Sequence, residues 1–149
     1  MILTRTKAQI SEYVQMFVAL SGVTVNELDN RETYLKWKMY CGAISAQFTD
    51  LVQAWNDEAI AEFAIPDDVI KSLQAYTQAV DKAEGNVKLI EKLNKKYEDA
   101  LVVEADTRKK LDEAFNVEVK VEIEELFPKE EVPLNVNGAY LNEIKEFLK

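Results

Sequence analysis

Histidine is absent from this 149-residue sequence, and cysteine, glycine and proline are rare, with one, four and three residues respectively. Without histidine the chain lacks the commonest general base, the usual zinc ligand and every Ser–His or Cys–His dyad. The single cysteine, Cys41, excludes an intramolecular disulfide and favours a reducing compartment. The scattered glycines cannot form the glycine-rich loop that holds a phosphate.

Sites made of carboxylates alone remain, and no pattern assigns them a reaction. Glu58 and Glu62 share a helical face at the spacing of metal-bridging carboxylates in helical bundles, but the histidines that accompany such carboxylates are missing. We expect no enzymatic activity, no cofactor and no metal ion.

Long apolar runs are also missing, since none approaches the ~20 residues that a membrane span requires. The first residues, MILTRTKAQISEY, lack the apolar segment of a secretory signal. The composition, 48% hydrophobic and 30% charged, is an ordinary globular balance for one domain. These features predict a cytoplasmic protein without a membrane partner.

The net charge is −9, from 18 basic and 27 acidic residues. This sign opposes direct binding to nucleic acid or to anionic membranes. Acidic residues are densest between Asp112 and Glu131, where eight acids accompany two lysines, a net charge of −6. Such a window either steers a basic partner protein to the surface or is only a solvated face that maintains solubility. The candidate partner surface consists of Glu118, Glu122, Glu124, Glu125, Glu130 and Glu131.

A heptad pattern over residues 34–55 is the strongest structural signal. Apolar residues recur there at spacings of three and four, which predicts a helix from Asn30 to about Phe63, ended by Pro66. The stripe is either intramolecular core, with Cys41 as a buried inert thiol, or a seam shared with a partner or a second copy. It contains Tyr34, Trp37, Cys41, Ile44, Phe48, Leu51 and Trp55.

Helices are predicted on both sides of this segment. Thr4 and Thr6 are both candidate N-caps of a first helix that Gly22 ends. After Pro66 the helical spacing continues to about residue 101, with an interruption at EGN (84–86). This interruption favours two helices in a hairpin, with one bent helix or a short β-hairpin as alternatives. A further short helix is expected at 105–115.

The segment VEVKVEIEEL, residues 117–126, alternates apolar and charged residues and predicts a half-buried strand. A second alternation follows at 132–136, interrupted by Pro133, and the two are predicted to pair as an antiparallel hairpin. Asn137–Gly138 precede a final amphipathic helix. The expected fold class is mainly α (α+β), a single domain over 1–149, with antiparallel helices forming a core at about 4–115. A small C-terminal β-hairpin and a closing helix occupy about 117–149.

The order of short segments, RETYLKWKM, EGN, DEAFN, VEVKVEI and NGAYLNEIKEFL, resembles small uncharacterised proteins of tailed bacteriophages, a family of unknown function. The resemblance implies a phage origin, a bacterial cytoplasm and a non-enzymatic role. The first hypothesis is a phage accessory protein that binds a basic host protein, as an inhibitor or modulator of a defence or nucleic-acid-processing protein. The second is a morphogenesis or virion-associated component that self-assembles as a homo-oligomer through the 34–55 stripe.

Overall fold

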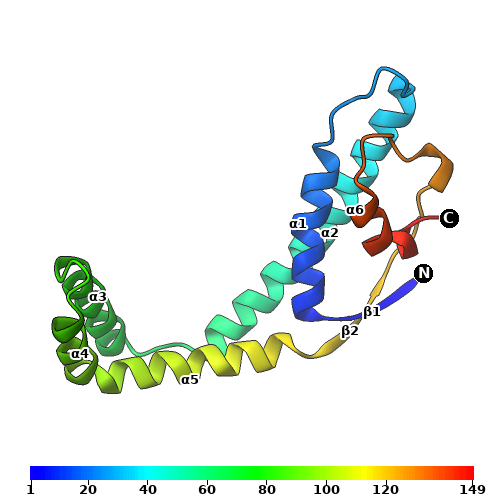
Figure 1. Ribbon diagram of the computed structural model, residues 1–149. Helices are drawn as coiled ribbons and strands as arrows, with labels where there is room; N and C mark the ends of the chain where they lie inside the picture. The colour runs from blue at the N-terminus through cyan, green and yellow to red at the C-terminus, as the bar shows by residue number, and fades with distance from the viewer. The chain divides into compact units, whose positions relative to one another are not determined.

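A computed structural model describes all residues from 1 to 149 and is mainly helical, with one two-stranded antiparallel sheet (Figure 1). None of the helices combines the length and the apolar composition that a membrane-spanning helix requires. The helices are α1 (Lys7–Ser21), α2 (Arg31–Glu62), α3 (Asp67–Lys82), α4 (Val87–Lys96), α5 (Glu98–Phe115) and α6 (Gly138–Glu143), with 3₁₀ turns η1 (Lys129–Glu131) and η2 (Lys145–Phe147); the strands are β1 (Ile2–Thr6) and β2 (Glu118–Glu122).

The chain forms two compact units. Unit 1 contains Met1–Asn56 and Asn116–Lys149, and unit 2 contains Asp57–Phe115. This division differs from the expected one, because the first 56 residues cluster with the C-terminal segment rather than with the helices after Pro66.

The sheet joins β2 to the N-terminal strand β1. Residues 117–123 were expected to pair with 132–136 in a C-terminal hairpin, and that pairing is wrong: Leu3 lies opposite Val121 in an antiparallel register. Residues 129–131 form a 3₁₀ turn instead, and Pro133 has no backbone N–H to donate to a ladder. The predicted alternation is present from Glu118 to Ile123, where Val121 and Ile123 are buried and Glu118 and Glu122 are exposed, but Val117, which was expected on the buried face, is 51% exposed and precedes the strand.

Of the two candidate N-caps of helix α1, Thr6 is the one found, and Thr4 lies in β1. The Thr6 hydroxyl accepts a hydrogen bond from the Gln9 backbone N–H (3.2 Å), and the Gln9 side chain accepts one from the Thr6 backbone N–H (3.0 Å). This reciprocal capping box satisfies two N–H groups that the helix cannot pair internally. The helix ends at Gly22 and buries one face, made of Ile10, Tyr13, Phe17 and Leu20.

The core of unit 1 is largely aromatic. Phe17 and Phe147 meet edge to face with ring centroids 4.9 Å apart, and Phe48 contacts both rings at 6.1–6.2 Å. Trp37 is fully buried, and its indole N–H donates to the Leu20 carbonyl (3.1 Å) at the C-terminal end of α1. The core therefore brings together α1, α2 and the last residues of the chain.

The C-terminal segment is held on α2 rather than forming an independent hairpin. The expected closing helix is present as α6 with the η2 turn, and Ile144 and Phe147 are fully buried. The Asn137 side chain caps α6 by accepting from the Ala139 N–H (2.9 Å). A short bridge pairs Phe127 with Leu148.

Unit 2 is helical throughout. Of the three alternatives for residues 67–101, the two-helix hairpin is the one found: α3 and α4 flank Gly85, which has φ of 78°, and Asn86 caps α4. The Tyr76 hydroxyl donates to the Asn94 side chain (2.6 Å) and ties the two helices together. Helix α5 starts at Glu98, earlier than the expected 105.

Candidate partner-binding groove

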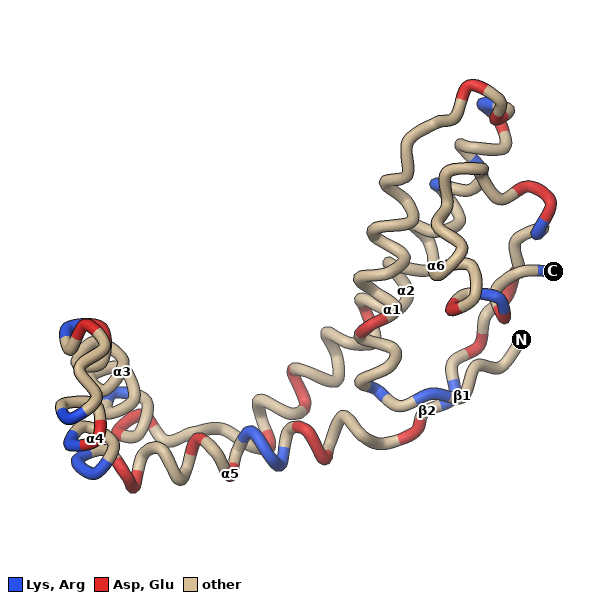
Figure 2. Tube along the Cα trace, viewed as in Figure 1, with Lys and Arg blue, Asp and Glu red and all other residues tan.

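The six glutamates of the candidate partner surface lie on one continuous segment of unit 1 (Figure 2). Two are at the ends of β2, two follow it in the connection to Pro128, and two belong to η1. Five are exposed, and Glu131 is half-buried. None forms a salt bridge, because the four ion pairs of the chain involve other carboxylates. Their negative charge is therefore not neutralised within the chain.

Four of the six line a groove between α2 and the segment that follows β2. The groove consists of two adjoining hollows of about 540 and 870 Å³, which share Tyr40 and Ala43 from α2. Its apolar floor includes Met39, which is 75% exposed, and the half-buried Leu126. The carboxylates are Glu122, Glu124, Glu125 and Glu131, against two lysines, Lys36 and Lys149. Glu118 and Glu130 lie outside the groove.

Side chains of α2 hold the acidic segment in place. The Tyr40 hydroxyl lies 3.0 Å from the Glu125 carbonyl and 3.2 Å from the Phe147 carbonyl, and its single hydrogen can be donated to one of them at a time. The Gln47 side-chain amide donates to the Glu122 carbonyl (2.9 Å). These bonds fix the backbone of the glutamates and leave their side chains free of ion pairs.

The Tyr40 hydroxyl remains a hydrogen-bond donor over the physiological range. Burial, together with the nearby Cys41 and Glu125, raises the pKa of Tyr40 to about 12, because the phenolate would lose much of its hydration. The anchor between α2 and the acidic segment is therefore insensitive to pH near neutrality.

The 34–55 stripe faces the interior of unit 1. Trp37, Ile44 and Phe48 are buried, while Tyr34, Leu51 and Trp55 are half-buried against the same unit. The Tyr34 hydroxyl donates to the Val23 carbonyl (2.7 Å), and the Lys7 ammonium lies 5.4 Å from the centre of the Trp55 ring. The buried members offer no surface to a second copy.

A different edge of α2 forms the wall of the groove, and sequence reasoning missed it. Met39, Ala43 and Gln47 recur every four residues and lie on one helical face beside Tyr40. The available signal was the apolar Met39, which follows Lys36 and Lys38 and lies outside the heptad stripe. This edge of α2 forms a groove only because residues 122–128 lie beside it.

The other polar clusters provide no catalytic arrangement. Glu146 accepts from Arg5 (2.6 Å) and from the Tyr13 hydroxyl (3.0 Å), which links β1, α1 and η2 as a structural bridge. Burial raises the pKa of Cys41 to about 12, so its thiol is not a nucleophile near neutral pH. No group of three or more Cys, Asp or Glu side chains lies close enough together to hold a metal ion.

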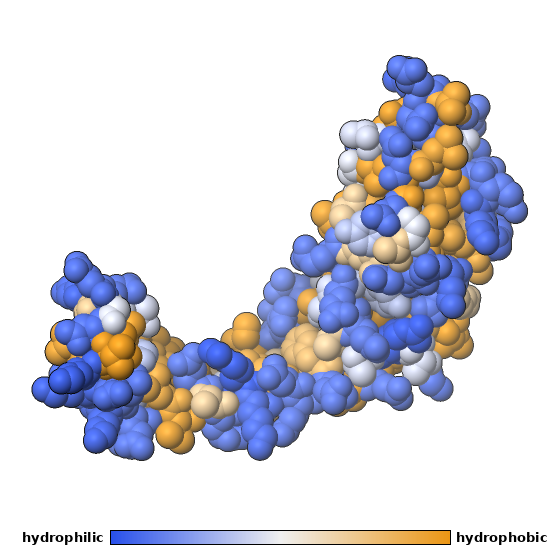
Figure 3. Space-filling model, viewed as in Figure 1, coloured by the Kyte–Doolittle hydropathy of each residue, from blue (hydrophilic) through white to orange (hydrophobic).

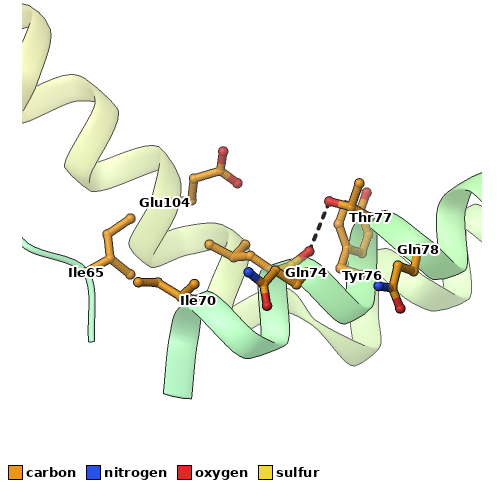
Figure 4. Close-up of a pocket in the computed structure, with 8 residues that line it drawn as sticks. Ile65, Ile70, Gln74, Tyr76, Thr77, Gln78 and Glu104 are labelled. Carbon is orange, nitrogen blue, oxygen red and sulfur yellow. Dashed lines mark hydrogen bonds between the residues drawn. The ribbon is translucent and has the colours of Figure 1, made fainter. Parts of the chain in front are cut away.

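Unit 2 contains a cavity of about 640 Å³ between α3 and α5, lined in part by Ile65, Ile70 and Gln74 (Figure 4). Its only carboxylate, Glu104, pairs with Arg108 at 2.7 Å. The Thr77 hydroxyl donates back to its own helix, at the Leu73 carbonyl (3.0 Å). This cavity has no free reactive group.

No family model, curated protein or solved structure matches this chain. The groove on unit 1 is the feature from which a function can be argued, because it combines exposed apolar surface with unpaired charge of one sign.

Proposed function

We propose that the protein acts without catalysis, by binding a basic and partly apolar segment of another protein in the groove of unit 1. The observation that carries this proposal is the combination of four glutamates without ion pairs around a floor formed by the exposed Met39 and Ala43 and the half-buried Tyr40. A charged rim around an apolar centre is the usual composition of a protein-binding surface.

The floor and the rim contribute differently to binding. Covering a methionine side chain contributes about 1.5–3 kcal/mol, and its flexible thioether adapts to the partner's shape. An exposed ion pair contributes only ~0.2–1 kcal/mol, but several carboxylates of one sign accelerate association with a basic partner. We therefore expect Met39 to determine much of the affinity, and the glutamates to determine the choice of partner and the salt dependence.

The backbone of the acidic segment is held by Tyr40 and Gln47 before any partner binds. Less ordering is then required on association, which favours affinity. Proteins that process nucleic acid expose basic surfaces for phosphates, and an acidic groove can occupy such a surface. In agreement with the resemblance to phage proteins, we propose a phage accessory protein that inhibits or modulates a host defence or nucleic-acid-processing protein.

The proposal is tested by an affinity pull-down from a bacterial lysate, washed at low and then high salt. The comparison uses the Glu124→Lys/Glu125→Lys variant and the matched control Glu12→Lys/Glu27→Lys, whose residues are exposed and outside the groove. Wild type and control should retain the same basic protein at low salt and lose most of it at high salt. The groove variant should retain little of it at either concentration.

If wild type, control and groove variant retain the same amount of partner, the groove is not the binding site. If binding of the partner is unchanged by salt, the glutamates do not attract it by their charge. The alternative, a self-assembling component, needs a surface other than the 34–55 stripe, because Trp37 and Phe48 are fully buried.

A further inference from the structure

A further hollow of unit 1, of about 940 Å³, lies among η1, α6 and η2, and we call it the lysine-lined hollow. Figure 3 shows apolar surface next to hydrophilic residues on the end of unit 1 that contains η1 and α6. The most open apolar side chain of the hollow is Leu134, which is 63% exposed. Open apolar surface of this kind indicates contact with another molecule. The apolar residues that line the hollow are Val132, Pro133, Leu134, Val136, Leu141 and Leu148.

The lysines of the C-terminal segment gather at this hollow. Residues 116–149 contain four lysines and eight glutamates, and three of these lysines but none of the glutamates line the hollow. The three are Lys129, Lys145 and Lys149. All three are exposed, and none forms a salt bridge. An acidic segment therefore contains one hollow whose charged lining residues are all lysines.

The glutamates that are close to these lysines in the sequence lie elsewhere on the surface. Glu146 pairs with Arg5 at 2.6 Å, and Glu131 lines the groove of unit 1. Glu130 and Glu143 are exposed, and they line neither the hollow nor the groove. The positive charge of the hollow is therefore available to a bound molecule.

Hydrogen bonds hold the turn that presents Leu134. The Leu134 backbone N–H donates to the Asp29 carboxylate (3.2 Å), which also accepts from the Asn26 backbone N–H (3.2 Å). The Asn135 side chain donates to the Thr24 carbonyl (3.0 Å). The exposed leucine is thus positioned before any molecule binds, which reduces the ordering that binding requires.

We propose that the lysine-lined hollow binds an acidic and partly apolar segment of a partner protein. An apolar side chain of that segment covers Leu134, and its carboxylates lie beside Lys129 and Lys145. Charge complementarity favours this occupant, because the hollow has unpaired lysines and no carboxylate among its lining residues. Lysine ammonium groups on flexible stems respond to charge rather than to the shape of one small molecule, which favours a protein segment. This site selects the opposite charge from the groove of unit 1 and does not depend on that groove's function.

Unit 2 contains a smaller groove of the same kind, of about 340 Å³, between α3 and α4. Its rim includes Lys92 and Lys96, which are exposed and form no salt bridge, and its floor is Leu89, Leu93 and two alanines. The lysine-lined hollow is favoured over this groove because its apolar lining is larger and includes no alanine. The groove of unit 2 provides matched control positions.

The test is fluorescence anisotropy of a short labelled peptide of glutamates and leucines, titrated with the full chain. Wild type should bind the peptide saturably, and more weakly at high salt. The Lys129→Glu/Lys145→Glu variant should bind at least ~10-fold more weakly, because two attractions become repulsions. Leu134→Ser should also weaken binding at least ~10-fold, since the leucine no longer covers apolar surface of the peptide.

The controls make the same changes in unit 2. The Lys92→Glu/Lys96→Glu variant and Leu89→Ser should each bind the peptide as wild type does. A peptide in which serines replace the leucines should bind wild type at least ~10-fold more weakly. Far-ultraviolet circular dichroism verifies that every variant is helical.

Absence of saturable binding, or equal binding by the Lys129→Glu/Lys145→Glu variant, would overturn the proposal. So would a loss of binding in the unit 2 controls that matches the loss in the variants of the hollow. Displacement of the peptide by an equal concentration of decanoate would indicate a small-molecule site and would also overturn it. None of these substitutions replaces a residue of the groove of unit 1, so binding of the acidic peptide and capture of a basic partner can fail separately.

Discussion

Replacing Tyr40 with phenylalanine should loosen the acidic segment while leaving the core intact. The substitution removes one hydroxyl hydrogen, which is donated to the carbonyl of Glu125 or of Phe147. A net hydrogen bond contributes about 0.5–1.5 kcal/mol. The lower half of that range applies, because the Glu125 carbonyl can be rehydrated and the Phe147 carbonyl also accepts from the Phe127 N–H (2.9 Å).

The free energy of unfolding should therefore fall by about 0.5–1 kcal/mol, and Tm by ~1–4 °C for a chain of this size. Urea denaturation measures the first, and calorimetry the second. Hydrogen exchange should show faster exchange at the Phe127 amide, with unchanged protection of Leu20 in α1. A loss above ~3 kcal/mol, or unchanged exchange at Phe127, would refute the assignment of Tyr40 as a local anchor.

Three further outcomes are expected. Met39→Gln should reduce partner retention at least ~10-fold in the pull-down with a stability change within ~0.5 kcal/mol, and unchanged retention would show that Met39 does not contribute to binding. Phe48→Ala, on the opposite side of the same helix, should cost about 3–5 kcal/mol in urea denaturation because it leaves a cavity among aromatic rings, and a loss below ~1 kcal/mol would contradict its place in the core. The pKa of Tyr40 and that of Cys41 are both raised to about 12 on folding, from 10.0 and 9.0, so their contribution to stability is present below about pH 9 and declines as pH rises toward 12. Thermal melts from pH 8 to 11 should show this decline, and Tyr40→Phe should show less of it.

Local features of the sequence predicted much of the helical structure. The Thr6 cap, the stop at Gly22 and the helix from Asn30 to about Phe63 each depend on residues within a few turns, and all are found. The break at EGN is also local, since Gly85 and Asn86 provide the turn and the cap.

The strand that pairs with β2 could not be predicted from local features of the sequence. Leu3 and Val121 are 118 positions apart, and a five-residue strand such as ILTRT has too little alternation to stand out. The alternation at 132–136 was closer in the chain, but Pro133 and the turn after Pro128 prevent its use as a strand.

The sequence predicted the charged residues of the candidate groove but not its apolar floor. Composition alone identified the glutamates from 118 to 131 as a charged surface, because charge density needs no knowledge of the fold. The apolar floor required the placement of residues 122–128 beside Met39 and Ala43, which depends on hydrogen bonds from Tyr40 and Gln47 across about 80 residues of chain.

The division of unit 1 into two chain segments has a consequence for synthesis. Its core needs Phe147 from η2 and Phe17 from the first helix, so it cannot close on the ribosome until residue 147 has emerged. Unit 2 is one continuous chain segment, and its helices contact those that follow them in the sequence. It is therefore able to form before the aromatic residues of α1 and α2 are buried. During that interval the nascent chain exposes Phe17, Trp37 and Phe48, which are fully buried in the finished core, and exposed apolar surface of this kind favours aggregation.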